Sequence, residues 1–385
     1  LSWTGPDGVT VTRTYVLHRG QFVIDVRHEV HNASNRPWAA QLYRQLVRVN
    51  TRHGRKLLPT YLGAAWYDGK YHKLKFEDMS EEPLQTTLKG GWVAMLEHYF
   101  VSAWIGSPER AELAYSRVVH EGASPRYLVG MRDEQALQVP AGGDGRIETR
   151  LYVGPKLQKH LAEVAPGLEL TTDYGMFTVF AKPLFWLLSF VHEFVGNWGW
   201  SIIIVTILLK LAFYRLSAAS YRSMARMRAV QPKLQALKER YGDDKQRMNQ
   251  ELMALYKKEK INPLGGCLPM LVQIPVFIGF YWMLLETVEL RQAPFILWIR
   301  DLSTMDPYFV LPILMGLSMI VQQKLNPAPL DPIQQKVMMA MPIVFTVFFA
   351  FFPSGLVLYW LTNNILSIAQ QWWIMRHLGQ ESAKA

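Results

Sequence analysis

The chain has 385 residues, a net charge of +10 and 50% hydrophobic residues, but its two halves differ in kind. Residues 1–173 contain 21 Lys and Arg against 19 Asp and Glu, whereas residues 174–385 contain 20 against 12. Long uncharged runs at 261–285, 307–323 and 337–375 exclude a purely soluble protein.

The first half of the chain predicts an all-β domain. Residues 9–17, 22–30 and 146–153 alternate apolar and polar side chains, and Gly, Pro and Asn separate stretches of this kind. About 150 such residues are typical of a β-sandwich. We place this domain at residues 1–173, with a short helix expected at 156–164.

Residues 174–198 predict an amphipathic helix that lies in the membrane interface. Apolar side chains follow helical spacing, but Lys182, His192 and Glu193 interrupt them, which favours an interfacial helix over a span. The same periodicity leaves a buried helix packed on the sandwich as an alternative.

Five membrane-spanning helices are expected within residues 199–376. The second should begin near Gly266 and bend at Pro275, because proline disturbs a helix interior. Residues 353–355, Pro-Ser-Gly, should divide the last apolar run into two spans joined by a tight hairpin. The expected spans are 200–214, 261–285, 307–323 and the two parts of 337–375.

Basic residues set the orientation, because Lys and Arg collect in short loops on the cytosolic side of a membrane. They cluster in 215–260 and recur at Lys324 and Arg376, which five spans would place on one side. Residues 1–173 are therefore expected to be extracytoplasmic, and the tail 377–385 cytosolic.

Residues 217–260 predict a cytosolic helical hairpin. A turn at 241–244 separates its arms, and Pro232 is expected to interrupt the first arm. The apolar seam that would join the arms contains Met227, Val230, Leu234, Leu237, Met248, Leu252 and Leu255.

The segments that resemble catalytic or metal-binding motifs do not have the spacing or the structural context that such motifs require. His28 and His31 are three residues apart in a predicted strand, where they face opposite sides. Residues 353–355 do not form a nucleophile elbow, and no phosphate-binding loop is present. The single cysteine, Cys267, excludes an intramolecular disulfide and a cysteine-based zinc site. We expect no enzyme, no cofactor, no metal and no direct nucleic-acid role.

Polar side chains recur inside the expected spans. Lys210 is the only charge in the first span, with Thr206 one turn earlier on the same face. Together Thr206, Lys210, Gln273, Asn363 and Asn364 predict a partly hydrated groove. Two alternatives stay open: Lys210 could snorkel to the interface, and the two asparagines could hydrogen-bond between helices.

Short spans are the second functional signal. Residues 337–352 would reach about 24 Å as a helix, less than the roughly 30 Å hydrocarbon core. A short span thins the bilayer locally or leaves polar ends inside it. Thinning and a wet groove both lower the barrier to moving a polar segment across lipid, which describes an insertase.

Five segments of the second half are distinctive, namely GWSIIIVT (199–206), YGDDKQR (241–247), NPLGGC (262–267), VELRQAPF (288–295) and FPSGLVLY (352–359). They closely resemble the YidC/Oxa/Alb family of membrane protein insertases. The resemblance is specific from about Gly90 to Arg376. It implies a periplasmic β-supersandwich, a membrane-surface helix and a five-span core in the bacterial inner membrane, and this chain would lack the family's N-terminal span.

The resemblance also implies roles for individual residues. Lys210 takes the position of the basic residue in the family's groove, which is usually Arg. The positions that match the apolar face in contact with substrate are Ile274, Phe277, Phe348, Phe352, Tyr359 and Trp360.

The implied partners are nascent membrane proteins, membrane lipids and the Sec translocon. Hairpin 217–260 matches the loop that would contact the ribosome and the signal-recognition-particle receptor. A solute transporter or channel is the rival interpretation, but it should show paired half-helices or an internal repeat. A carbohydrate-binding module on a membrane anchor would leave the hairpin unexplained.

Overall fold

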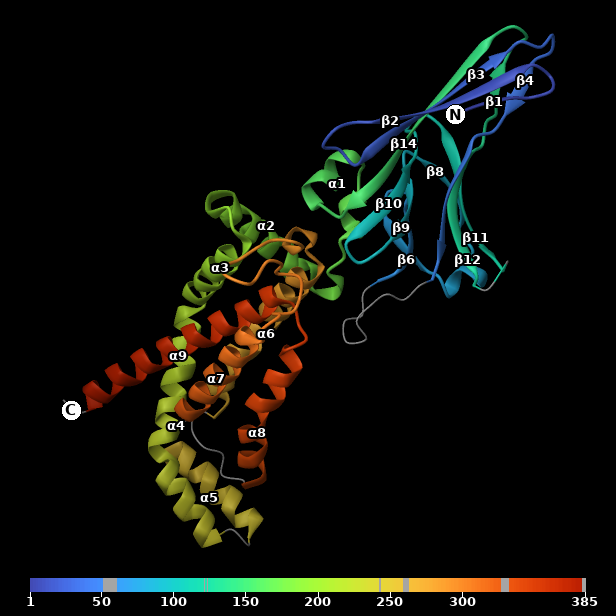
Figure 1. Ribbon diagram of the computed structural model, residues 1–385. Coiled ribbons are helices and arrows are strands. Elements are labelled where there is room, and N and C mark those ends of the chain that lie inside the picture. Colours follow the sequence, from blue (N-terminus) through green and yellow to red (C-terminus); the bar gives the residue numbers. More distant parts are fainter. Residues whose placement is uncertain are drawn as a thin grey trace. The chain divides into compact units, whose positions relative to one another are not determined.

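The computed structural model describes residues 1–50, 61–120, 122, 124–241, 244–258, 263–326 and 332–382. The chain divides into two compact units, residues 1–173 and 174–385. The first unit is built from strands and the second from helices (Figure 1).

The described strands of the first unit form a sandwich of a large and a small sheet. The large sheet has the order β1-β2-β3-β14-β10-β9-β6-β7, the small sheet has β5-β12-β11-β8, and β13 pairs with β4. The strands are β1 Ser2–Thr4, β2 Val9–Leu17, β3 Val23–Asn32, β4 Trp38–Ala40, β5 Tyr43–Val49, β6 Gly63–Tyr67, β7 Tyr71–Lys75, β8 Gln85–Lys89, β9 Trp92–Leu96, β10 Phe100–Ile105, β11 Ala111–Val119, β12 Arg126–Asp133, β13 Leu137–Val139 and β14 Asp144–Pro155. The predicted β-sandwich is confirmed.

Apolar side chains cover both faces of the large sheet. Between the sheets, Val93 and Met95 pack with Val129 and Met131 of the small sheet. On the opposite face, a second cluster includes Leu161 of helix α1, Gln158–Val164. Burial on both faces explains why β9 is a continuous apolar run without alternation.

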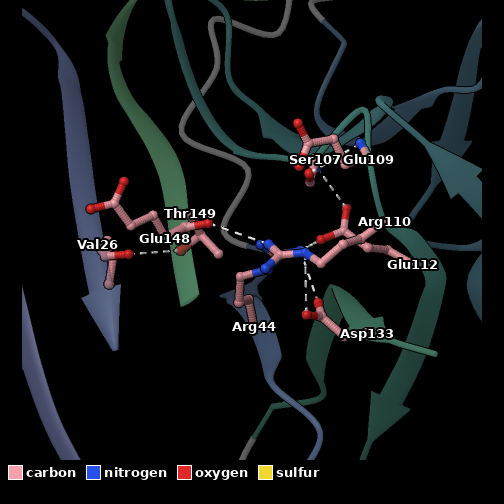
Figure 2. A network of polar contacts seen from close by, with 9 residues as sticks. All are labelled: Val26, Arg44, Ser107, Glu109, Arg110, Glu112, Asp133, Glu148 and Thr149. Carbon is pink, nitrogen blue, oxygen red and sulfur yellow. Dashed lines mark hydrogen bonds and ion pairs between the residues drawn. The ribbon is translucent and has the colours of Figure 1, made fainter. Parts of the chain in front are cut away.

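A network of charged side chains lies in the interior of the sandwich (Figure 2). Arg44 on β5 donates a hydrogen bond to Glu112 on β11, and the two residues are 3% and 0% exposed. The second Glu112 oxygen accepts from the Ser107 backbone N–H at 3.1 Å. Arg110 lies 3.6 Å from Asp133 on β12 and donates to the Glu148 carbonyl of the large sheet. The network therefore connects both sheets.

The second unit contains the helices that follow α1. They are α2 Thr178–Val195, α3 Trp198–Ala212, α4 Tyr214–Tyr241, α5 Lys245–Lys258, α6 Pro263–Glu286, α7 Val310–Leu325, α8 Pro332–Phe349 and α9 Ser354–Ser382. Helices α3, α6, α7, α8 and α9 coincide with the five expected spans, and the predicted hairpin break lies between α8 and α9. That all five cross the membrane stays a prediction.

The apolar helices differ in their capacity to span a membrane. Among the described residues, the segment Gly175–Val195 alone is long and apolar enough by itself. Helices α3 and α4 are long and apolar enough to span a membrane only when they are taken together, but the chain bends by 68° between them. Shorter apolar helices cover Gln273–Glu286, Val310–Leu325 and Gln335–Phe349. The segment with α2 has the length of a span, so its interfacial placement stays a prediction.

Two proline-based expectations were wrong. Helix α6 begins at Pro263 instead of near Gly266, because proline lacks the N–H that a first helical turn leaves unbonded. Helix α4 continues through Pro232, which is exposed on its surface. The hairpin seam forms nonetheless: Val230 and Leu234 are buried against Leu252 and Leu255 of α5. Turn residues 242 and 243 lie outside the described residues.

A buried histidine makes the β domain sensitive to acid. His28 is 6% exposed and accepts a hydrogen bond from Arg13 at 2.9 Å. Burial, and then the charges of Arg13 and Arg44, lower the pKa of His28 to about 4. The unfolded chain binds a proton near pH 6.5, so the free energy of unfolding should fall by about 3 kcal/mol between pH 6.5 and 4. His28→Gln should flatten this fall in urea unfolding, and His31→Gln, an exposed control, should not.

Removing one partner of the buried Arg44–Glu112 ion pair should lower the free energy of unfolding more than replacing both partners with apolar residues. Glu112→Leu removes the carboxylate that accepts a hydrogen bond from the buried Arg44 guanidinium and leaves Asp133, 3.8 Å away, as its remaining ion pair, so we expect a loss of about 3 kcal/mol in the unfolding of residues 1–173. The double variant Arg44→Met/Glu112→Leu should recover most of this loss. Pulse proteolysis of the full chain in urea measures both, and a double variant as unstable as the single one would contradict the expectation.

Candidate functional site

A cavity of about 360 Å³ lies inside the helical unit, among α3, α4, α6, α7 and α9. One group of lining side chains is polar and the other is apolar. The polar group is Thr206, Lys210, Ser217, Ser220, Tyr221, Gln273, Gln322, Asn326, Asn363 and Ser367. The apolar and aromatic group is Leu209, Phe213, Met224, Ile274, Val276, Phe277, Tyr359 and Trp360.

Lys210 provides the positive charge of this cavity. It lies in the last turn of α3, and its Nζ donates a hydrogen bond to Ser367 Oγ on α9 at 2.8 Å. Ser367 Oγ in turn donates to the Asn363 carbonyl at 2.7 Å. Within the described part of the chain, the lining residues include no carboxylate. The ammonium group of this lining residue therefore has a neutral hydroxyl as its hydrogen-bond partner.

Other polar contacts fasten the cavity wall. Gln273 Nε2 of α6 donates to Ser217 Oγ of α4 at 3.0 Å. Thr206 is buried, and its hydroxyl donates to the Ile202 carbonyl one turn earlier at 2.6 Å. A hydroxyl bonded to its own helix adds polarity without linking two helices. Of these two hydrogen bonds, the one between Gln273 and Ser217 therefore joins two helices, α6 and α4.

Aromatic rings form the apolar wall and continue beyond it. The Phe277 ring centroid lies 5.3 Å from that of Tyr359 and 4.5 Å from that of Trp360. Trp360 is 4.6 Å from Phe349 of α8, which is in turn 5.1 Å from Phe352. A continuous run of rings therefore connects α6, α9 and the end of α8.

The predicted site residues separate into two sets. The cavity brings together Thr206, Lys210, Gln273, Asn363, Ile274, Phe277, Tyr359 and Trp360. Asn364 instead donates to Ser318 of α7 at 3.2 Å, which is the interhelical bond that the sequence left open. Phe348 and Phe352 lie in the ring run outside the lining, Phe348 exposed and Phe352 buried.

Sequence reasoning missed Ser217, Ser220, Tyr221 and Ser367. A signal for Ser367 was present, because it follows Asn363 by one helical turn and continues the same polar face. The residues on α4 were assigned to the cytosolic hairpin from 217 onward. In the structure the first two turns of α4 instead lie against the cavity.

The loop between α6 and α7 holds the ends of the helices that surround the cavity. Asn197 caps α3 and donates to the carbonyls of Pro294 and Phe295. A side chain at Gly199 would overlap the Phe295 ring, since its Cβ would lie 2.1 Å away. Ser354, at the start of α9, donates through both N–H and hydroxyl to the Thr304 carbonyl.

Asp306 organises the second half of this loop. It is 1% exposed and accepts three hydrogen bonds. The donors are Trp298 Nε1 at 2.9 Å and the backbone N–H groups of Tyr308 at 3.0 Å and Leu311 at 2.8 Å. A carboxylate at the start of α7 also complements the positive end of the helix dipole.

A charged, partly polar cavity beside exposed aromatic and aliphatic rows can accept a polar segment and an apolar segment together. The polar wall supplies hydrogen-bond partners and one positive charge. The apolar rows continue to exposed side chains such as Ile274 of α6 and Phe348 of α8. Among the described residues, no group of His, Cys, Asp and Glu is arranged to hold a metal ion.

Comparison with known proteins finds relatives over the whole chain. Residues 1–187 match the family model of the YidC periplasmic domain, and residues 190–381 match that of the 60Kd inner membrane protein. A membrane protein insertase YidC from Thioalkalivibrio sulfidiphilus is 59% identical over 385 residues, which cover 100% of this chain and 69% of that protein. A membrane protein insertase YidC from Methylococcus capsulatus is 52% identical over 390 residues, which cover 100% of this chain and 71% of that protein. A solved structure described as an active YidC insertase aligns with 93% of this chain and 94% of its own, with 19% identity and a TM-score of 0.44.

The fold and the cavity define a class of protein in which a β-sandwich unit is followed by a unit of apolar helices around a charged cavity. The sequence matches narrow this class: the chain belongs to the YidC family of membrane protein insertases. The predicted inner membrane location and periplasmic β domain are thereby confirmed. The relatives are named as membrane protein insertases, so the expected substrates are nascent membrane proteins.

Removal of the Asp306 carboxylate should loosen the loop that holds the helix ends. Asp306→Ala leaves one buried donor and two part-buried donors without their carboxylate acceptor, so we expect a loss of about 2–3 kcal/mol in the stability of the helical unit. Thermal unfolding in detergent, followed by tryptophan fluorescence, measures the effect. Asp301→Ala is the control, because the Asp301 carboxylate accepts from the backbone N–H and the hydroxyl of Ser303, two residues along the same loop. Equal losses in the two variants would contradict the assigned role.

Proposed function

We propose that this chain inserts membrane proteins by taking the polar part of a substrate into the cavity around Lys210. The observation that carries the proposal is an ammonium group inside an apolar helical unit, with a serine hydroxyl as its partner. An intramembrane charge is costly and usually marks a functional path. An acidic substrate tail would supply the missing negative charge for the time of its passage.

The apolar part of the substrate would leave along the aromatic side. Ile274 and Phe277 on α6, with Phe348 and Phe352 at the end of α8, form the proposed contact face, together with Tyr359 and Trp360. Exposure of Ile274 and Phe348 supports this path, because both can contact a hydrophobic segment in lipid. Transfer of that segment into lipid is favourable by about 0.8 kcal/mol per buried CH₂.

Short helices would lower the barrier to moving the polar part of the substrate across the membrane. Helix α7 has 16 residues, which corresponds to about 24 Å against a hydrocarbon core of roughly 30 Å. A thinned bilayer shortens the path of the polar tail, and the membrane potential favours movement of acidic tails outward. The proposed cycle needs no nucleotide and no catalytic residue.

The remaining assignments follow from the same proposal. Residues 174–198 form the membrane-surface helix, 199–376 the insertase core and 377–385 the cytosolic tail. Hairpin 217–260 carries basic side chains on α4 and α5, which suits contact with the ribosome or the signal-recognition-particle receptor. The Sec translocon is the proposed partner for substrates with several spans.

The charge of Lys210 should matter most for acidic tails. Lys210→Ala should lower insertion of single-span substrates with acidic tails about tenfold, the effect expected from losing about 1.4 kcal/mol of attraction. Multispan substrates that use the translocon should be affected less. Insertion into native membranes, read by protease protection of the tail, measures both classes.

Two matched variants serve as controls for this experiment. Lys210→Arg keeps the charge and should retain most of the insertion. Lys324→Ala removes a lysine from the exposed end of α7, outside the cavity lining, and should insert both classes normally. If Lys210→Ala impairs both substrate classes equally, the charge is not acting on the tail. Passage of small solutes through the unaltered chain would favour a transporter or channel instead.

A further inference from the structure

Helix α8 is weakly attached to the helical unit. Of its residues 335–349, for which side chains are described, Pro342 and Phe349 are the buried ones. Its principal packing partner is α7. The apolar side chains on its other faces are exposed, namely Val337, Met339, Met341, Ile343, Val344, Val347 and Phe348.

The α7–α8 contact depends on the absence of a side chain at Gly316. A Cβ at this buried position of α7 would lie 1.9 Å from Thr346 Oγ1 and 3.2 Å from Thr346 Cβ. Thr346 Oγ1 donates to the Pro342 carbonyl of its own helix at 2.7 Å. The hydroxyl is therefore held in place and cannot rotate away without losing that bond. Close approach of two helices over a small residue is a common way to associate helices in lipid.

A second attachment lies one turn further along the same face of α8. Phe349 is buried, and its ring lies 4.6 Å from Trp360 of α9 and 5.1 Å from Phe352. The adjacent Phe348 is exposed and contacts Phe352 at 4.7 Å. Because both attachments lie in the C-terminal half of α8, a change at one of them should tilt the helix about the other.

We propose that Gly316 is a positioning residue for insertion. It sets the distance between α7 and α8, and through α8 it sets where Phe348 lies relative to Ile274 and Phe277 on α6. The inference rests on the proposed function, since it concerns the apolar face along which a substrate segment leaves. Gly316 itself lies outside the cavity lining and outside that face, so it acts through Thr346 and α8.

Distances between spin labels on α6 and α8 test the geometric step. The labels are placed at Leu271→Cys and Val344→Cys, both exposed, in a Cys267→Ser background of the full chain in lipid nanodiscs. Gly316→Ala should shift the main distance and lower insertion several-fold. Thr346→Ala added to Gly316→Ala removes the overlapping hydroxyl and should restore both the distance and the insertion.

Two further variants keep the test decisive. Leu317→Ala changes an exposed neighbour on α7 and should leave both distance and insertion unchanged. Thr346→Leu enlarges the same contact from α8, so it should shift the distance even if Gly316→Ala does not fold. An unshifted distance in the folded variants would overturn the inference, as would a shifted distance with normal insertion. Failure of the proposed function looks different, because the unaltered chain would then insert no substrate.

Discussion

The structure of the helical unit depends on one constraint, the placement of a charged amine among apolar helices. Lys210 satisfies it by reaching Ser367 on α9, and the polar side chains around this bond keep a cavity between the helices. A pair of apolar residues at these positions would allow the helices to close. A buried amine is costly unless polar groups or water surround it, so the charge favours a polar cavity at this place among the helices.

Such a cavity stays open only if the surrounding helices are fixed elsewhere. The loop between α6 and α7 provides this by joining the N-terminus of α3, the start of α7 and the start of α9 through Asn197, Asp306 and Ser354. Its hydrogen bonds are mostly to backbone groups, which hold position better than contacts between flexible side chains. Rigidity at this end of the helices permits weak attachment at α8, where the proposed substrate face needs freedom to move.

Much of the fold could be predicted because its determinants are local. Alternation marked β2, β3 and β14, and Pro353 with Gly355 marked the break between α8 and α9. The candidate site was predictable where polar residues interrupt apolar spans, as at Lys210 and Asn363. Two other features could not be found in this way. The partner of Asn364 depends on how α9 packs against α7, and Ser217 was hidden by a helix that continues from the membrane part into the hairpin.

Two buried basic residues in this chain show opposite solutions to the same electrostatic problem. In the β domain, the Arg44 guanidinium is paired with the Glu112 carboxylate of the same sheet, so its charge is neutralised. In the cavity, the Lys210 ammonium has a hydroxyl as its partner, so its charge remains available to a ligand. A carboxylate beside Lys210 would compete with an acidic substrate tail for the ammonium group. A neutral hydroxyl partner therefore suits the proposed transient binding of such a tail.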